Sequence, residues 1–145
     1  MNLHEFHDGS FDGFWVEGTT VHLFLTTPDG KGFVALATGV TALAAGGFRP
    51  GSIVFDVLVR GHSEVTAHEI SDLYDLREGA DGAVQIERLL KNVNQLELKV
   101  LEINPSYGGT CLLLAEAVDF ITRSKWRERF LLEDALNWPA RDDKR

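Results

Sequence analysis

The sequence predicts an α+β fold, in which a curved or partly barrel-like antiparallel sheet of about six strands carries two helices. Alternating apolar stretches recur at residues 21–25, 52–59 and 96–103, and turns that contain glycine separate them. Since successive side chains of a strand point to opposite faces, each stretch offers one face to a core. The two predicted helices lie between the fourth and fifth predicted strands. This order favours helices packed on one face of an antiparallel sheet over a parallel nucleotide-binding sheet.

The first half of the chain reads as hairpins. Strands are predicted at 11–17, 20–27 and 33–39. The turn between the last two contains Pro28, which fixes φ, and Asp29-Gly30, which readily supplies positive φ. Residues 40–48 predict an irregular link, because Gly46 and Gly47 argue against a long helix. A fourth strand follows at 53–60.

The second half begins with helices. Thr66 and Glu69 form a capping-box pattern, which predicts a helix over 67–76. Apolar spacing from Val84 to Val93 predicts a second helix that ends near residue 94. Strands at 96–103 and 110–118 then form a hairpin through the loop 104–109. Residues 126–138 fit either a strand or a helix, which Pro139 ends.

Length and charge limit the class of protein. The 145 residues predict one domain over 1–140 and a charged tail at 141–145, and a chain of this size folds without disulfides or a metal. The net charge of −8 disfavours nucleic-acid binding. It favours a basic protein partner through faster encounter, although the same charge also serves solubility.

The predicted location is cytoplasmic. Cys111 is the single cysteine, which fits a reducing compartment. The first six residues lack the basic start and apolar run of a signal peptide, and no apolar stretch approaches the ~20 residues of a membrane helix. We therefore expect no membrane association, and the oligomeric state stays open.

Motifs for catalysis and metal binding are incomplete. A nucleophile elbow at Ser63 requires glycine where the chain has Val65, and a zinc helix starting at His68 requires histidine where it has Asp72. Cys111 lies among leucines, where a thiol is inert. The sequence thus favours a non-enzymatic protein, and we expect no catalytic residue, metal or cofactor.

The candidate partner-binding residues are the carboxylates around the first predicted helix. They are Glu64, Glu69, Asp72, Asp75, Glu78 and Asp81. A solvated helix face explains this run, and so does an acidic docking surface for a basic protein. Phe14 and Trp15 alternate, so one of them could face outward and anchor an interface. Burial of both, one in the sheet core and one beneath a helix, is the favoured interpretation.

The alternative function is a small enzyme or ligand-binding domain with a pocket near His7, Asp8 and Tyr107. An imidazole and a carboxylate can act as acid and base, and Tyr107 adds a phenol from the loop 104–109. A turn at Asp8-Gly9 explains the first pair equally. The predicted core comprises Leu23, Leu25, Phe55, Val57, Leu98, Val100 and Leu113.

The start of the chain resembles several small bacterial β-rich families. The likeness lies in Phe6-His7-Asp8-Gly9 ahead of the first strand, then a turn and the stretch 21–25, and covers about the first forty residues. Some of these families are immunity proteins that neutralise polymorphic toxins. The resemblance implies a bacterial cytoplasmic source and a binding function, and no functional residue is carried over from it.

Overall fold

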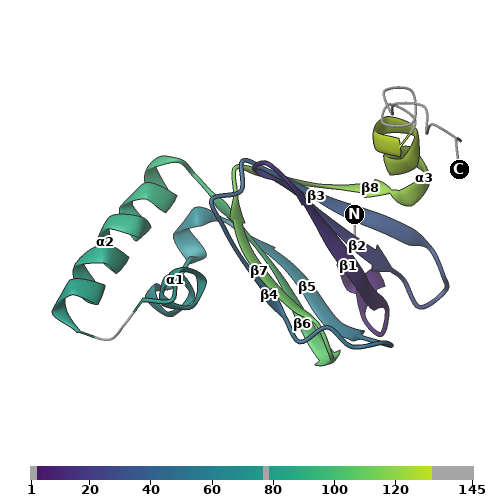
Figure 1. Ribbon diagram of the computed structural model, residues 1–145, viewed down its shortest axis with the longest axis horizontal. Helices are drawn as coiled ribbons and strands as arrows, with labels where there is room; N and C mark the ends of the chain where they lie inside the picture. The colour runs from purple at the N-terminus through teal and green to yellow at the C-terminus, as the bar shows by residue number, and fades with distance from the viewer. Residues whose placement is uncertain (1–2, 77–78, 132–145) are drawn as a thin grey trace, which may run out of the picture.

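The computed structural model describes residues 3–76 and 79–131, which form two antiparallel sheets packed face to face (Figure 1). The first sheet has the order β1-β2-β3-β8, with β1 at Ser10–Glu17, β2 at Thr20–Thr26, β3 at Gly32–Thr38 and β8 at Ala117–Thr122. The second sheet has the order β4-β7-β6-β5, with β4 at Ala42–Gly46, β5 at Ile53–Arg60, β6 at Lys99–Tyr107 and β7 at Thr110–Ala115.

Helices lie outside both sheets (Figure 1). The longer ones, α1 at Ala67–Tyr74 and α2 at Ala80–Gln95, pack on the second sheet, and α3 at Arg123–Trp126 packs on the first. Short helical turns are η1 at Leu3–Phe6, η2 at His62–Glu64 and η3 at Arg127–Leu131.

The main core lies between the sheets. Leu23 and Leu25 of β2 are fully buried there, as are Leu101 of β6 and Leu113 of β7. Phe6 of η1 closes one side of this core, with its ring 5.6 Å from that of Phe33. A smaller core under α1 and α2 contains Ile70, Val93, Leu98, Val100 and Leu114. Burial of these two apolar sets supplies the main driving force for folding.

The predicted α+β class is confirmed, but the single curved or partly barrel-like sheet of about six strands with two helices is wrong in detail. The described residues contain eight strands in two sheets and three α-helices. The expected irregular link 40–48 contains β4, which pairs with β7 from Ala42 opposite Leu114 to Gly46 opposite Thr110. The expected strand 110–118 is interrupted near Glu116, where the chain crosses from the second sheet to the first.

Phe55 was expected in the core, and the structure shows this to be wrong, because its side chain is 54% exposed. The register of β5 against β6 shifts on both sides of Val54, so Val54 and Val57 face the core although they lie three residues apart. Such a bulge breaks strict alternation. The other six predicted core residues are buried.

Two expectations about loops and the C-terminal part also change. Because β6 extends to Tyr107, only Gly108 and Gly109 separate it from β7, and the positive φ of Gly108, 89°, suits glycine. The ambiguous segment 126–138 is helical as far as Leu131. The rest of that segment and the predicted tail 141–145 lie outside the described residues.

Candidate functional site

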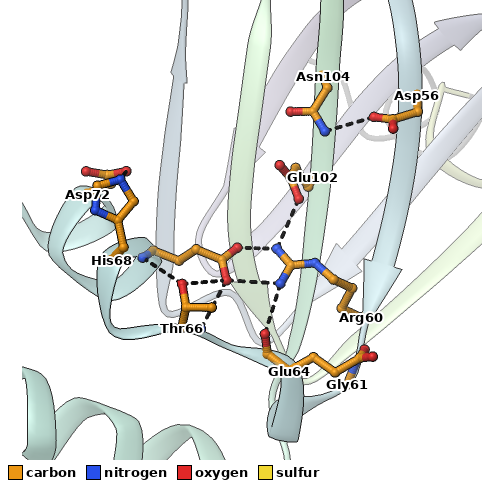
Figure 2. A network of polar contacts seen from close by, with 10 residues as sticks. Asp56, Arg60, Gly61, Glu64, Thr66, His68, Asp72, Glu102 and Asn104 are labelled. Carbon is orange, nitrogen blue, oxygen red and sulfur yellow. Dashed lines mark hydrogen bonds and ion pairs between the residues drawn. The ribbon is translucent and has the colours of Figure 1, made fainter.

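Arg60 organises a polar network at the point where β5, β6 and α1 meet (Figure 2). Its Nη1 donates to Glu69 Oε1 at 3.0 Å and to the backbone oxygen of Glu64 at 3.0 Å. Its Nη2 donates to Glu102 Oε2 at 3.0 Å and to the second carboxylate oxygen of Glu69. The guanidinium therefore makes a bidentate pair with Glu69, the geometry that arginine favours for a carboxylate.

Glu69 has two structural roles in this network. Hydrogen bonds from Arg60 and from Thr66 hold the pKa of Glu69 below its ordinary value, while partial burial opposes them. Its carboxylate also accepts the backbone N–H of Thr66 at 3.0 Å, and the Thr66 hydroxyl accepts the N–H of Glu69 at 3.2 Å. This is the predicted capping box. The carboxylate of Glu69 is therefore occupied by hydrogen bonds within the fold.

The other predicted carboxylates are more accessible. Glu64, Asp72, Asp75 and Asp81 are exposed, whereas Glu78 lies outside the described residues. Asp72 forms an ion pair with His68 at 3.3 Å, and Asp75 ends α1 in the left-handed conformation with φ 48°. These residues surround α1, as the sequence indicated. Among the described ones, only Glu69 pairs with the partly buried Arg60.

The sheet adds two carboxylates that sequence reasoning missed. Asp56 of β5 and Glu102 of β6 lie on the outer side of the second sheet. Glu102 accepts a hydrogen bond from Arg60, and farther from α1 Asp56 accepts one from Asn104 at 2.8 Å (Figure 2). A shallow hollow of about 410 Å³ lies next to them, lined in part by Ala44, Gly46 and Glu102. Polar residues at 56, 102 and 104, within otherwise apolar strands, were the available signal.

The residues of the alternative site lie around the first half of β5. His7 donates from Nδ1 to the backbone oxygen of Phe55 at 2.7 Å, and its Nε2 lies 3.7 Å from Asp8. His7 lines a hollow of about 430 Å³ between η1 and β5, but neither Asp8 nor Tyr107 lines it. Tyr107 instead lies opposite Ile53 and beneath the guanidinium of Arg49, 5.8 Å from its ring centre. Of the three predicted residues, His7 alone lines this hollow.

A buried histidine is a further feature that the sequence interpretation missed. His22 is fully buried on the outer side of the first sheet, where Trp126 Nε1 donates to its Nδ1 at 2.9 Å. Trp15 stacks on the imidazole at 4.6 Å, and Phe130 meets it edge-on at 4.8 Å. Phe14, by contrast, is 42% exposed, so the favoured expectation that Phe14 and Trp15 are both buried is wrong. His22 is next to the core residue Leu23 in β2, so the alternation of side chains places His22 on the opposite face, away from the core.

The described part of the chain offers few side chains for metal binding or thiol chemistry. Residues 3–76 and 79–131 contain no group of three or more His, Cys, Asp or Glu side chains that could hold a metal ion. Burial raises the pKa of the Cys111 thiol to about 12, so this sulfur stays protonated at neutral pH. Within the same residues, no helix has the length and apolar character needed to cross a membrane.

Comparison of the chain with protein-family models, with curated proteins and with solved structures finds no match. The functional interpretation therefore depends on the geometry of the chain itself.

Proposed function

We propose that this chain is a non-enzymatic protein-binding domain that presents an acidic face to a basic partner. The acidic face is defined here as Asp56, Glu64, Asp72, Asp75 and Glu102. The observation that carries the proposal is that Glu69 of α1 and Glu102 of β6 both bind Arg60, while Glu64, Asp72 and Asp75 around α1 stay exposed (Figure 2). Neutralisation of a toxic basic protein is the form of this function that the resemblance to immunity families suggests.

Electrostatics supports this choice of partner. Arg60 is paired with Glu69, so its positive charge is already balanced before Glu102 and the rest of the acidic face are considered. The whole chain carries a net charge of −8. A surface of one sign accelerates the encounter with a surface of the opposite sign, and exposed charges at an interface rim act mainly on the association rate.

The test compares two triple variants with the same change in charge. The first changes Glu64, Asp72 and Asp75 to Lys, and the control changes Glu17, Asp119 and Glu128, which are exposed on the first sheet and η3. The immobilised wild-type protein captures partners from its source cells, and surface plasmon resonance then measures association with the purified partner. We expect the first variant to slow association about tenfold or more at low salt, and the control to have a much smaller effect.

Salt provides the second measurement. The Debye length falls from about 10 Å at 0.1 M to about 3 Å at 1 M, so association of the wild-type protein should slow as salt rises. Equal effects of the two variants, or a partner without a basic surface, would contradict the proposal. Substrate turnover that depends on His7 would favour the alternative enzyme interpretation.

A further inference from the structure

The outer face of the first sheet is apolar at its centre, and two short helical turns pack on it (Figure 1). In the pairing of β2 with β3, Val34 lies opposite Phe24 and Leu36 lies opposite His22, so all four side chains share this face. Val34 and Leu36 are buried, although neither belongs to the core between the sheets. Trp126 of α3 packs here, with its ring 4.9 Å from that of Phe24. The helical turns therefore keep an apolar face away from water.

His22 is the polar group at the centre of this contact. Its side chain is fully buried, and its Nδ1 accepts the indole N–H of Trp126 at 2.9 Å. Among residues 3–76 and 79–131, its Nε2 has no hydrogen-bond partner. Phe130 of η3 contacts the ring edge-on. This site suits a neutral imidazole, because a doubly protonated ring would need an acceptor at both nitrogens.

Few polar contacts hold the covering segment, defined here as residues 124–131, on the sheet. Arg123 lies just before this segment and is anchored to Asp12 of β1 at 3.0 Å. Within the described part of the chain, the bond from Trp126 to His22 is the only hydrogen bond from the covering segment to β1, β2 or β3. Apart from this bond, aromatic packing holds the covering segment in place.

We propose that His22 is a proton-operated latch, in which a second proton on the imidazole releases the covering segment from the outer face while both sheets stay folded. The proton comes from solvent and binds Nδ1. The new N–H then faces the indole N–H of Trp126, so an acceptor becomes a donor and the hydrogen bond is lost. Water reaches the charged ring once the covering segment has moved, and this hydration favours the released state.

The charges near His22 agree with this direction when the closed and released states are compared. Arg129 of η3 opposes protonation of the ring, and it moves away with the covering segment. Glu17 favours protonation, and so does stacking on Trp15, but both residues belong to β1 and stay beside His22 after release. Only a difference between two states shifts their equilibrium. The other charged groups on this face and on the two helical turns are exposed or already paired; they are Asp12, Asp119, Arg123, Lys125, Arg127 and Glu128.

The pH range of the latch follows from the burial of His22. Desolvation is the largest influence on the pKa of His22 and lowers it from the ordinary value of 6.5, whereas a hydrated ring in the released state has a pKa nearer that value. The contribution of His22 to the closed state is therefore complete above about pH 6.5 and falls as the pH decreases. Since one proton is involved, the ratio of released to closed molecules rises by at most about tenfold per pH unit.

Hydrogen exchange of the Trp126 indole N–H, measured by NMR between pH 5 and pH 7.5, tests the latch. We expect its protection factor to fall by up to about tenfold per pH unit below about pH 6.5, while the backbone N–H of the core residue Leu101 stays protected. His22→Gln keeps a side-chain acceptor without a titratable ring and should remove this dependence. His68→Gln is the control, because His68 is largely exposed, and should leave the dependence unchanged. An indole N–H that exchanges only together with Leu101, or an equal pH dependence in His22→Gln and the wild type, would overturn the proposal.

The pKa of His22 itself, measured by NMR of the imidazole, decides the case if His22→Gln does not hold the covering segment. Trp126→Ala removes the anchor of this segment, so the pKa of His22 should rise toward 6.5. Ser124→Ala, at an exposed position of α3, is the control and should leave this pKa unchanged. The same pKa in Trp126→Ala and the wild type would show that the covering segment does not control protonation, and the proposal would be overturned.

Discussion

His22 couples its protonation state to the packing of α3. The indole N–H of Trp126 donates to His22 Nδ1, so the imidazole is neutral with its proton on Nε2. A second proton on Nδ1 would point at this indole donor. Desolvation lowers the pKa of His22, nearby Glu17 raises it, and Arg129 of η3 lowers it. The net direction is downward, because burial is the largest of the three effects.

We predict that His22 makes the free energy of unfolding depend on pH. The folded-state pKa is below the ordinary value of about 6.5, so the unfolded chain binds more protons between the two values. The contribution of His22 is complete above about pH 6.5 and falls as the pH decreases toward the folded-state pKa. Urea titrations between pH 5 and pH 8 should show less of this dependence in His22→Gln than in the wild type.

The control for this prediction is His68→Gln, because the His68 side chain is 86% exposed. The same pH dependence in His22→Gln and the wild type would show that the imidazole does not titrate differently in the folded and unfolded states.

Phe55 provides a second prediction at the residue scale. Since half of its side chain is already in water, Phe55→Ala should cost less than about 1 kcal/mol of unfolding free energy. Leu101→Ala, at a fully buried position between the sheets, should cost about 2–5 kcal/mol. Urea titrations of both variants make the comparison. A cost of several kcal/mol for Phe55→Ala would place its ring in the core after all.

Among the elements, α1 depends most visibly on one local motif. It has only eight residues, and an isolated helix of that length is marginal in water. The Thr66 hydroxyl accepts the backbone N–H of Glu69, and the Glu69 carboxylate accepts the backbone N–H of Thr66. The same carboxylate holds Arg60, so the cap also connects the helix to the second sheet.

We predict that Thr66→Ala costs about 1 kcal/mol of unfolding free energy, because it removes the side-chain acceptor of the N-cap. Ser63→Ala, at an exposed position in η2, is the matched control and should change stability by less than about 0.5 kcal/mol. Denaturant titrations measure both. Equal costs for the two variants would show that the capping hydroxyl of Thr66 stabilises the fold no more than the exposed hydroxyl of Ser63.

Strands differed from helices in how well the sequence predicted them. The hairpin of β2 and β3 was predictable, because Pro28, Asp29 and Gly30 define the turn and apolar residues define the inward face. β4 was not, since its residues are small and its strand character comes from pairing with β7, more than sixty residues later. β8 was missed for a related reason, because apolar residues on both sides of Glu116 concealed the crossing there.

For the whole molecule, the second sheet carries part of the proposed acidic face. Its outer side contributes Asp56 and Glu102 to that face (Figures 1 and 2). α1 and α2 cover the other part of the same outer side through the smaller core.

The sequence by itself determined the α+β class, both long helices, the capping box and six of the seven predicted core residues. These features depend on local spacing and turn chemistry, which are visible within a few residues. Only the tertiary structure decided that the strands divide into two sheets, that Phe55 faces water, and that His7 lines a hollow without Tyr107. It also brought Arg60, Glu69 and Glu102 together and buried His22 under Trp126. The physical reason is that strand pairing, bulges and ion pairs join residues far apart in the chain, and no local pattern records which partner each will meet.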